Sequence, residues 1–226
     1  MVQQPTLLPL IRGEWIPMSS EEFDAWVPDG MQAEWVDGKG IIFVSTSTLH
    51  GELVVFLVDL LRRYVLLFDL GRVFAAPVEL RLPPRGERRE PDVFVVLKSQ
   101  LDRVHRMWVD GPAGLVAEFI SEYTAREDLF VKLRSYAAAG VREYLLIDTR
   151  EGKDGFEFYR LNADGQFDLV VPDAQGRYHS EVLPGFWLDP RWFRQDPLPT
   201  AEQLLLQVAP DEYRRYLVTL LDSTRE

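Results

Sequence analysis

The 226-residue sequence contains no cysteine. Disulfide bonds, thiolate metal sites and cysteine nucleophiles are therefore excluded, and this composition is typical of a cytoplasmic protein. Long apolar runs are also missing, because the longest stretch, Leu53 to Leu67, is interrupted by Asp59, Arg62 and Arg63. A helix that crosses a membrane needs about 20 mostly apolar residues in a row, so we expect no membrane span.

Positive charge is scarce, with 25 lysine and arginine residues against 36 acidic residues and a formal net charge of −11. Such an overall charge does not attract nucleic acid, so binding it would need a local cationic patch and bound cations. Four arginines lie in the segment 81–89 (RLPPRGERR), and Arg103, His105 and Arg106 follow it. These residues could form the patch. The alternative is a solvated, flexible loop.

The order of helical and strand patterns indicates one α/β domain over residues 1–226. Its core covers residues 18–190, and residues 197–226 form an appended helical extension. The extension begins with a capping box at Thr200 and Gln203. Helices of the core are predicted at residues 19–26, 50–68 and 124–139 from apolar spacing and capping residues.

Short apolar segments rich in β-branched residues predict the strands. They are residues 33–44, folded as a hairpin around an Asp37-Gly38 turn, and residues 72–82, 91–97, 115–120 and 143–148, with a further pair at 156–161 and 167–171. A helix separates strands 115–120 and 143–148, so these two should pair in parallel as a βαβ unit. The whole pattern predicts a mixed β-sheet flanked by helices.

Glu118 is a carboxylate inside an otherwise apolar strand, GLVAEFI. An unpaired buried charge costs several kcal/mol. Glu118 therefore either points to solvent from an exposed face or is held inside the protein by partners. Both faces are covered in an interior parallel strand, which favours a functional role for this carboxylate.

Asp92 follows Pro91 at the start of the strand PDVFVVL, where an aspartate commonly caps a turn. Carboxylates from two neighbouring strands could instead hold Mg²⁺ or Mn²⁺, because hard divalent cations prefer oxygen ligands and keep several waters. Such an ion activates water and neutralises charge on a phosphate that is being cleaved. Asp92 and Glu118 are therefore the candidate metal ligands.

Lys132 flanks the buried face of the helix predicted at 124–139 and could bring its ammonium to the Glu118 strand. There it would orient the attacking water or stabilise charge on the phosphate. The alternative is a surface ion pair with Asp128, four residues earlier. His50 lies at the start of the most apolar helix and could contact substrate or act as a helper base. A purely structural hydrogen bond is the alternative for His50.

The stretches PDVFVV and AEFISEYTAREDLFVKLRSYAAAGVREYLLID resemble the Uma family of restriction-endonuclease-like proteins. The motif residues that carry the resemblance are Pro91-Asp92, Glu118, Ile120-Ser121, Thr124, Asp128, Lys132, Tyr136, Gly140-Val141, Glu143-Tyr144 and Asp148. It extends over residues 18–190 through the segments SSEEFDAWVPDG and EWVDGKGIIF, through His50 and through LPGFWLD.

That family is grouped with the PD-(D/E)xK nucleases. The resemblance implies a restriction-endonuclease-like core and a metal-dependent endonuclease that cleaves nucleic acid, DNA in particular, with Asp92 and Glu118 as ligands. The superfamily's common lysine position is Ile120 here, so the resemblance moves the lysine role to Lys132. Glu122 stands where relatives often have proline. Glu34, in the E-x-x-D-G hairpin, is a further site carboxylate or a solvated strand-end acid.

Two other functions remain open at this point. The first is a catalytically silent nuclease fold that serves as a binding or assembly module. The acidic composition favours it, and so do the C-terminal helices, which could form a homodimer surface. The second is a metal-dependent hydrolase of a small phosphoester, because an acidic surface does not repel a small substrate as strongly as a polyanion.

Overall fold

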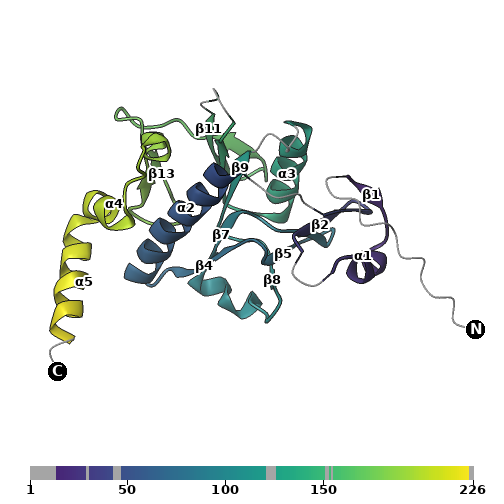
Figure 1. Cartoon of the computed structure of the whole chain (residues 1–226), viewed down its shortest axis with the longest axis horizontal. Coiled ribbons are helices and arrows are strands. Elements are labelled where there is room, and N and C mark those ends of the chain that lie inside the picture. The colour runs from purple at the N-terminus through teal and green to yellow at the C-terminus, as the bar shows by residue number, and fades with distance from the viewer. Residues whose placement is uncertain are drawn as a thin grey trace, which may run out of the picture.

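The computed structural model describes residues 14–28, 31–42, 47–120, 126–150, 153 and 155–223. Within these residues most strands belong to two six-stranded sheets (Figure 1). The N-terminal sheet contains, in spatial order, β1 (Ile16–Pro17), β3 (Lys39–Ile42), β2 (Ala33–Val36), β6 (Glu87–Arg89), β5 (Glu79–Leu82) and β8 (Trp108–Asp110). The main sheet contains β12 (Phe167–Leu169), β11 (Phe156–Leu161), β10 (Glu143–Asp148), β9 (Leu115–Ile120), β7 (Val93–Leu97) and β4 (Gly71–Ala75).

The helices begin close to where capping residues and apolar spacing predict them. They are α1 (Ser20–Trp26), α2 (Thr48–Leu67), α3 (Arg126–Ala139), α4 (Ala201–Val208) and α5 (Pro210–Ser223), with 3-10 helices η1 (Lys98–Arg103) and η2 (Pro190–Arg194). The capping boxes of α1, at Ser19 and Glu22, and of α4, at Thr200 and Gln203, are both formed. A small third sheet pairs β13 (Tyr178–His179) with β14 (Trp187–Leu188).

The main sheet is covered on both faces, which explains why its central strands are apolar throughout. Helix α2 packs on one face, where Leu57, Leu60 and Leu61 join a large apolar cluster (Figure 1). Helix α3 packs on the other face and contributes Tyr136 to a second cluster. Successive residues of β9 alternate between the two clusters, so Glu118 lies on the face that α3 covers.

Strands β9 and β10 are parallel and are joined through α3, as the βαβ pattern predicts. Leu146 of β10 is the register partner of Glu118 in β9. Both strands are thus buried next to a helix whose residues can reach Glu118. The fold is a mixed α/β arrangement of sheets flanked by helices, which confirms the predicted fold class.

Two local predictions are wrong. Residues 72–82 do not form one strand, because the chain turns at Ala76 to Val78 and places β4 in the main sheet and β5 in the N-terminal sheet. Pro77 has no amide hydrogen for a sheet ladder, which favours a break there. The alternative of a solvated loop over residues 81–89 is also wrong in part, because the end of this segment forms β6, which pairs with both β2 and β5.

The C-terminal extension packs through α4 against α2, where Leu204 and Leu205 are fully buried. Helix α5 follows and points away from the sheets (Figure 1). Its Tyr213 is buried, whereas Val218 and Leu221 are exposed. Among the described residues, no helix is both long enough and apolar enough to cross a membrane.

Candidate active site

Asp92 and Glu118 lie at the same end of two neighbouring strands of the main sheet. Strands β7 and β9 are antiparallel and pair Val93 with Ala117, so the next position along brings Asp92 beside Glu118. The Phe119 amide also donates a hydrogen bond to Oδ2 of Asp92 at 2.8 Å. Two carboxylates that are distant in the sequence are therefore brought together by the strand register.

Helix α3 supplies two side-chain partners of Glu118. The Lys132 ammonium lies 3.0 Å from Oε2 of Glu118, and the Tyr136 hydroxyl donates to Oε1 at 2.7 Å. Lys132 and Tyr136 are four residues apart and so project from the same side of the helix. Glu118 is only 5% exposed, and these two donors compensate much of the cost of burying its charge.

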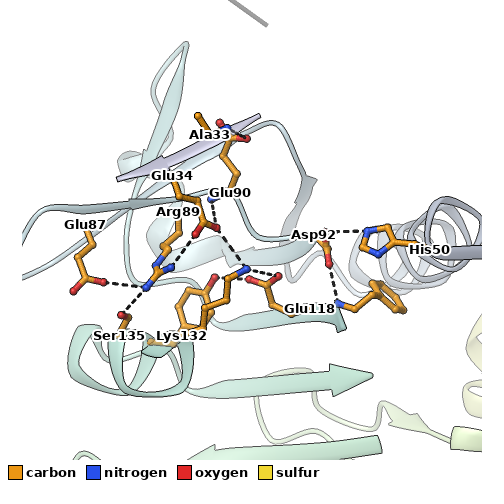
Figure 2. A network of polar contacts seen from close by, with 12 residues as sticks. Ala33, Glu34, His50, Glu87, Arg89, Glu90, Asp92, Glu118, Lys132 and Ser135 are labelled. Carbon is orange, nitrogen blue, oxygen red and sulfur yellow. Dashed lines mark hydrogen bonds and ion pairs between the residues drawn. The ribbon is translucent and has the colours of Figure 1, made fainter. Parts of the chain in front are cut away.

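A second buried acid, Glu34 of β2, extends the network from the N-terminal sheet (Figure 2). Its Oε1 lies 3.5 Å from the Lys132 ammonium, and its Oε2 accepts a hydrogen bond from Nη1 of Arg89 at 2.8 Å. Arg89, which is 1% exposed, also donates to Oγ of Ser135 on α3 at 3.0 Å. Lys132 is thus held between two carboxylates that come from different sheets.

His50 contacts Asp92 from the first turns of α2. Its Nε2 lies 3.3 Å from Oδ1 of Asp92 (Figure 2). Its ring packs edge-on against Phe119. Its backbone amide donates to the hydroxyl of Ser47, which caps the helix. Within the described part of the chain, Nδ1 of His50 has no hydrogen-bond partner. His50 therefore fixes one oxygen of Asp92 while the Phe119 amide fixes the other.

The charges of the network shift its pKa values in opposite directions. Burial raises the pKa of Glu118 to about 7, and the charges of Asp92 and Glu34 act in the same direction against the opposing ammonium of Lys132. Burial also raises the pKa of Glu90 to about 8. Burial alone would raise the pKa of Glu34 as well. The positive charges of Lys132 and Arg89 have the larger effect, so the pKa of Glu34 is lowered.

The basic groups respond to the same charges. Burial alone would lower the pKa of Lys132, but Glu118 and Glu34 raise it above its usual value. Burial opposes protonation of His50 as well, and the carboxylate of Asp92 outweighs it, so the pKa of His50 is raised. The region as a whole carries more buried acids than buried cations, which is an environment that favours a bound cation.

The donor set at Asp92 and Glu118 fits a hard divalent ion. Both residues offer carboxylate oxygens, and burial, together with the charges of Asp92 and Glu34, raises the pKa of Glu118. In the described ranges, no group of three or more acidic or histidine side chains is arranged to hold a metal. Mg²⁺ usually binds through one or two carboxylates and keeps several waters, so two such ligands are sufficient for it.

All five residues singled out in the sequence, Glu34, His50, Asp92, Glu118 and Lys132, lie in this one network (Figure 2). Their catalytic roles stay a prediction. The motif residues Ser121, Glu122 and Thr124 lie outside the described residues, and so does the side chain of Asp128, the alternative partner of Lys132.

The sequence did not identify the other members of the network, which include Arg89, Ser135, Glu87, Glu90 and Tyr136 as a partner of Glu118. Tyr136 and Ser135 follow Lys132 at helical spacing, and this signal could have placed them next to Glu118. Arg89 has no comparable local signal, because its partner Glu34 is on another strand.

The segment 81–89, for which the sequence left a cationic patch and a solvated loop as alternatives, lies partly in strands β5 and β6. Arg89 is buried, Arg85 pairs with Asp37, and Arg88 pairs with Asp24. Arg81 pairs with Glu79 and stacks on the ring of Trp108. Arg81, Arg88 and Arg89 thus serve contacts within the protein, and Arg85 is the one of the four that stays largely exposed.

Comparison with known proteins identifies the fold and the family. Among solved structures, the chain is similar to one from Anabaena variabilis ATCC 29413, described as "a putative nuclease belonging to DUF820", with 16% identity and a TM-score of 0.63. The match covers 78% of this chain and 97% of that chain. The fold is therefore of the restriction-endonuclease type.

The Uma2 family model, described as "Putative restriction endonuclease", matches residues 20–191. The chain belongs to this family, as the motifs in its sequence predict. Helices α4 and α5 lie beyond the matched residues. A search of curated proteins gave no match.

Proposed function

We propose that the chain is a metal-dependent endonuclease that hydrolyses phosphodiester bonds in nucleic acid, with DNA as substrate and Mg²⁺ or Mn²⁺ as the ion. The observation that carries this proposal is the buried carboxylate of Glu118, which lies 3.0 Å from the Lys132 ammonium and beside the strand that Asp92 precedes. Membership of the Uma2 family supports it.

Each residue of the network has a role in this proposal. Asp92 and Glu118 would hold the ion, which supplies water activation and charge neutralisation when bound. Lys132 places a positive charge next to Glu118, where negative charge develops on the phosphate during hydrolysis. Glu34 holds the ammonium from its other side, and Arg89 holds Glu34. Glu34, Arg89 and His50 are thus positioning residues.

Cleavage of plasmid and labelled oligonucleotides in the presence of Mg²⁺ or Mn²⁺ tests the activity. We expect Asp92→Asn, Glu118→Gln and Lys132→Met each to lower the rate at least about 100-fold, the usual effect of removing one group that stabilises the transition state. Asp59→Asn, an acid at the surface of α2, is the matched control and should cleave like the wild type. Failure to cut any DNA or RNA with either ion would contradict the proposal.

Thermal unfolding tests the metal site without relying on turnover. A ligand present at about 100 times its Kd stabilises the folded state by about 2.7 kcal/mol. For a chain of this length, that corresponds to a rise in Tm of about 5–10 °C. We expect Mg²⁺ or Mn²⁺ to raise the Tm of the wild type and not that of Glu118→Gln. Equal shifts in both proteins would exclude Glu118 as a ligand.

An assembly module without turnover is the second candidate, and helix α5 favours it. The exposed apolar side chains there are Tyr216, Val218, Leu220 and Leu221. They could bury one another in a homodimer, and we place this dimer, like the nuclease, in the cytoplasm. Light scattering of the wild type and of a Leu220→Ser, Leu221→Ser double variant tests the dimer. A dimer that binds nucleic acid but does not cleave it would favour this second candidate.

A further inference from the structure

A hollow of about 440 Å³ opens at the end of strand β10, beside the first turn of α2, which also carries His50. It lies between the start of α2, the end of β10 and the helix η2. Its apolar lining includes Leu53, Ile147, Phe156 and Phe193. Pockets that bind small ligands typically measure about 300–1,000 Å³ and have mostly apolar walls with a few polar groups.

One layer of aromatic rings connects the hollow to the site. Phe193, which lines the hollow, packs against Phe119 with ring centroids 6.5 Å apart. The amide of Phe119 binds Asp92, and its ring contacts His50. Helix α2 contributes Leu49 to the hollow and the adjacent His50 to the network. The hollow lies on the face of the main sheet that α2 covers, and Phe193, Phe119 and Leu49 connect it to the residues that bind Asp92.

Three basic side chains line the hollow. They are Arg150 and Lys153, which follow β10, and Arg194 at the end of η2. Asp148 holds the guanidinium of Arg150 through two contacts, at 2.9 and 2.7 Å, and so fixes its direction. The acids of the lining, Glu52, Asp148 and Asp196, match the three basic residues in number. The hollow is therefore much less acidic than the chain as a whole, which has 36 acids against 25 lysines and arginines.

We propose that this hollow binds an unpaired nucleotide of the substrate strand, next to the phosphate that is held at Asp92 and Glu118. The base and sugar lie on the apolar lining, and Arg150 and Arg194 contact the flanking phosphate. A base inside a duplex has both faces stacked and cannot enter such a hollow, whereas a single-stranded base can stack on aromatic side chains. The substrate class is thus single-stranded nucleic acid or a duplex with an unpaired end. This inference rests on the proposed nuclease function.

Fluorescence anisotropy with a short labelled single strand, and with the same sequence as a blunt duplex, tests the inference. Ca²⁺ replaces Mg²⁺ to allow binding while slowing cleavage. The variant is Arg194→Glu, an exposed residue of the hollow, and the control is Arg85→Glu, an exposed arginine on the far turn between β5 and β6 that changes the net charge equally.

We expect the wild type to bind the single strand more tightly than the duplex. Loss of one phosphate contact on a single strand makes the slope of log K against log salt less negative by about 0.7. At 0.1 M salt this corresponds to an affinity that is about fivefold weaker. Arg194→Glu should show at least this loss, and Arg85→Glu should keep the wild-type slope.

Equal effects of the two variants, or equal binding of duplex and single strand, would overturn the inference. If cleavage that depends on Asp92 and Glu118 is nevertheless observed, the proposed nuclease function stands and only the role of the hollow is lost. If the wild type neither binds nor cleaves nucleic acid, both proposals fail.

Discussion

Replacement of Arg89 by methionine should destabilise the protein far more than a typical arginine substitution. Arg89 is 1% exposed and contacts Glu34, Glu87 and Ser135. Methionine would fill much of the volume but would leave the carboxylate of Glu34, itself 0% exposed, without its nearest cation. Removing one partner of a buried ion pair costs about 3–5 kcal/mol. For a chain of this length the Tm should fall by about 6–20 °C.

A double-mutant cycle separates the ion pair from general damage. Glu34→Gln alone should cost about 1–3 kcal/mol, because it leaves hydrogen-bonding groups of Arg89 less well satisfied. In the double variant the buried charge of Glu34 is absent, so the combined cost should be smaller than the sum by about 2 kcal/mol. Urea unfolding at neutral pH without divalent ions measures each free energy. Costs that add to within about 0.5 kcal/mol would refute the reasoning, since independent sites behave in that way.

Two further predictions concern parts of the fold outside the site. Leu204→Ala should lower the free energy of unfolding in urea by about 2–5 kcal/mol, because the side chain is fully buried between α4 and α2. Val218→Ala, on the exposed part of α5, should change that free energy by no more than about 0.5 kcal/mol. Burial raises the pKa of Tyr64 to about 12, and its hydroxyl donates to the carbonyl of Pro184. Its contribution to stability is therefore present below about pH 10 and lost as the pH rises towards 12, so the wild type should lose stability more steeply in this range than Tyr64→Phe.

Predictions from local sequence patterns hold well in this protein. The start of α1 follows from Ser19 and Glu22, and the start of α4 follows from Thr200 and Gln203, because a capping box needs only residues three positions apart. The parallel pairing of β9 and β10 follows from the helix between them. The anomaly of a glutamate among apolar residues also singled out Glu118, and the structure shows that buried partners hold it.

Predictions that depend on distant pairing fail or are missed. The division of residues 72–82 between two sheets depends on the strands that pair with each half. The first half, β4, pairs with β7, and the second half, β5, pairs with β6 and β8. Burial of Arg89 depends on Glu34, which is 55 positions away in the sequence. A basic residue in a polar segment usually points to solvent. Only the spatial proximity of β2 and β6 shows that this one does not.

The acidic composition leads to a last prediction about how substrate is held. Five buried acids surround the site, Glu34, Glu87, Glu90, Asp92 and Glu118, against the buried cations Arg89 and Lys132. Arg81, Arg88 and Arg89 are engaged within the protein, and Arg85 is exposed but pairs with Asp37, so ion pairs reduce the basic charge that this segment offers to phosphates. Attraction for nucleic acid must then come mainly from the bound ion and from the few cations of the hollow.

Binding should therefore depend strongly on the divalent ion and only weakly on salt. About three phosphate contacts give a slope of log K against log salt near −2 for a single strand, whereas proteins with 6–10 contacts on duplex DNA show slopes of about −5 to −9. Titrations of the labelled single strand at several salt concentrations, with and without the divalent ion, measure both effects. A slope steeper than about −5, or affinity that persists when the ion is removed, would show that phosphates are held by a basic surface elsewhere on the protein.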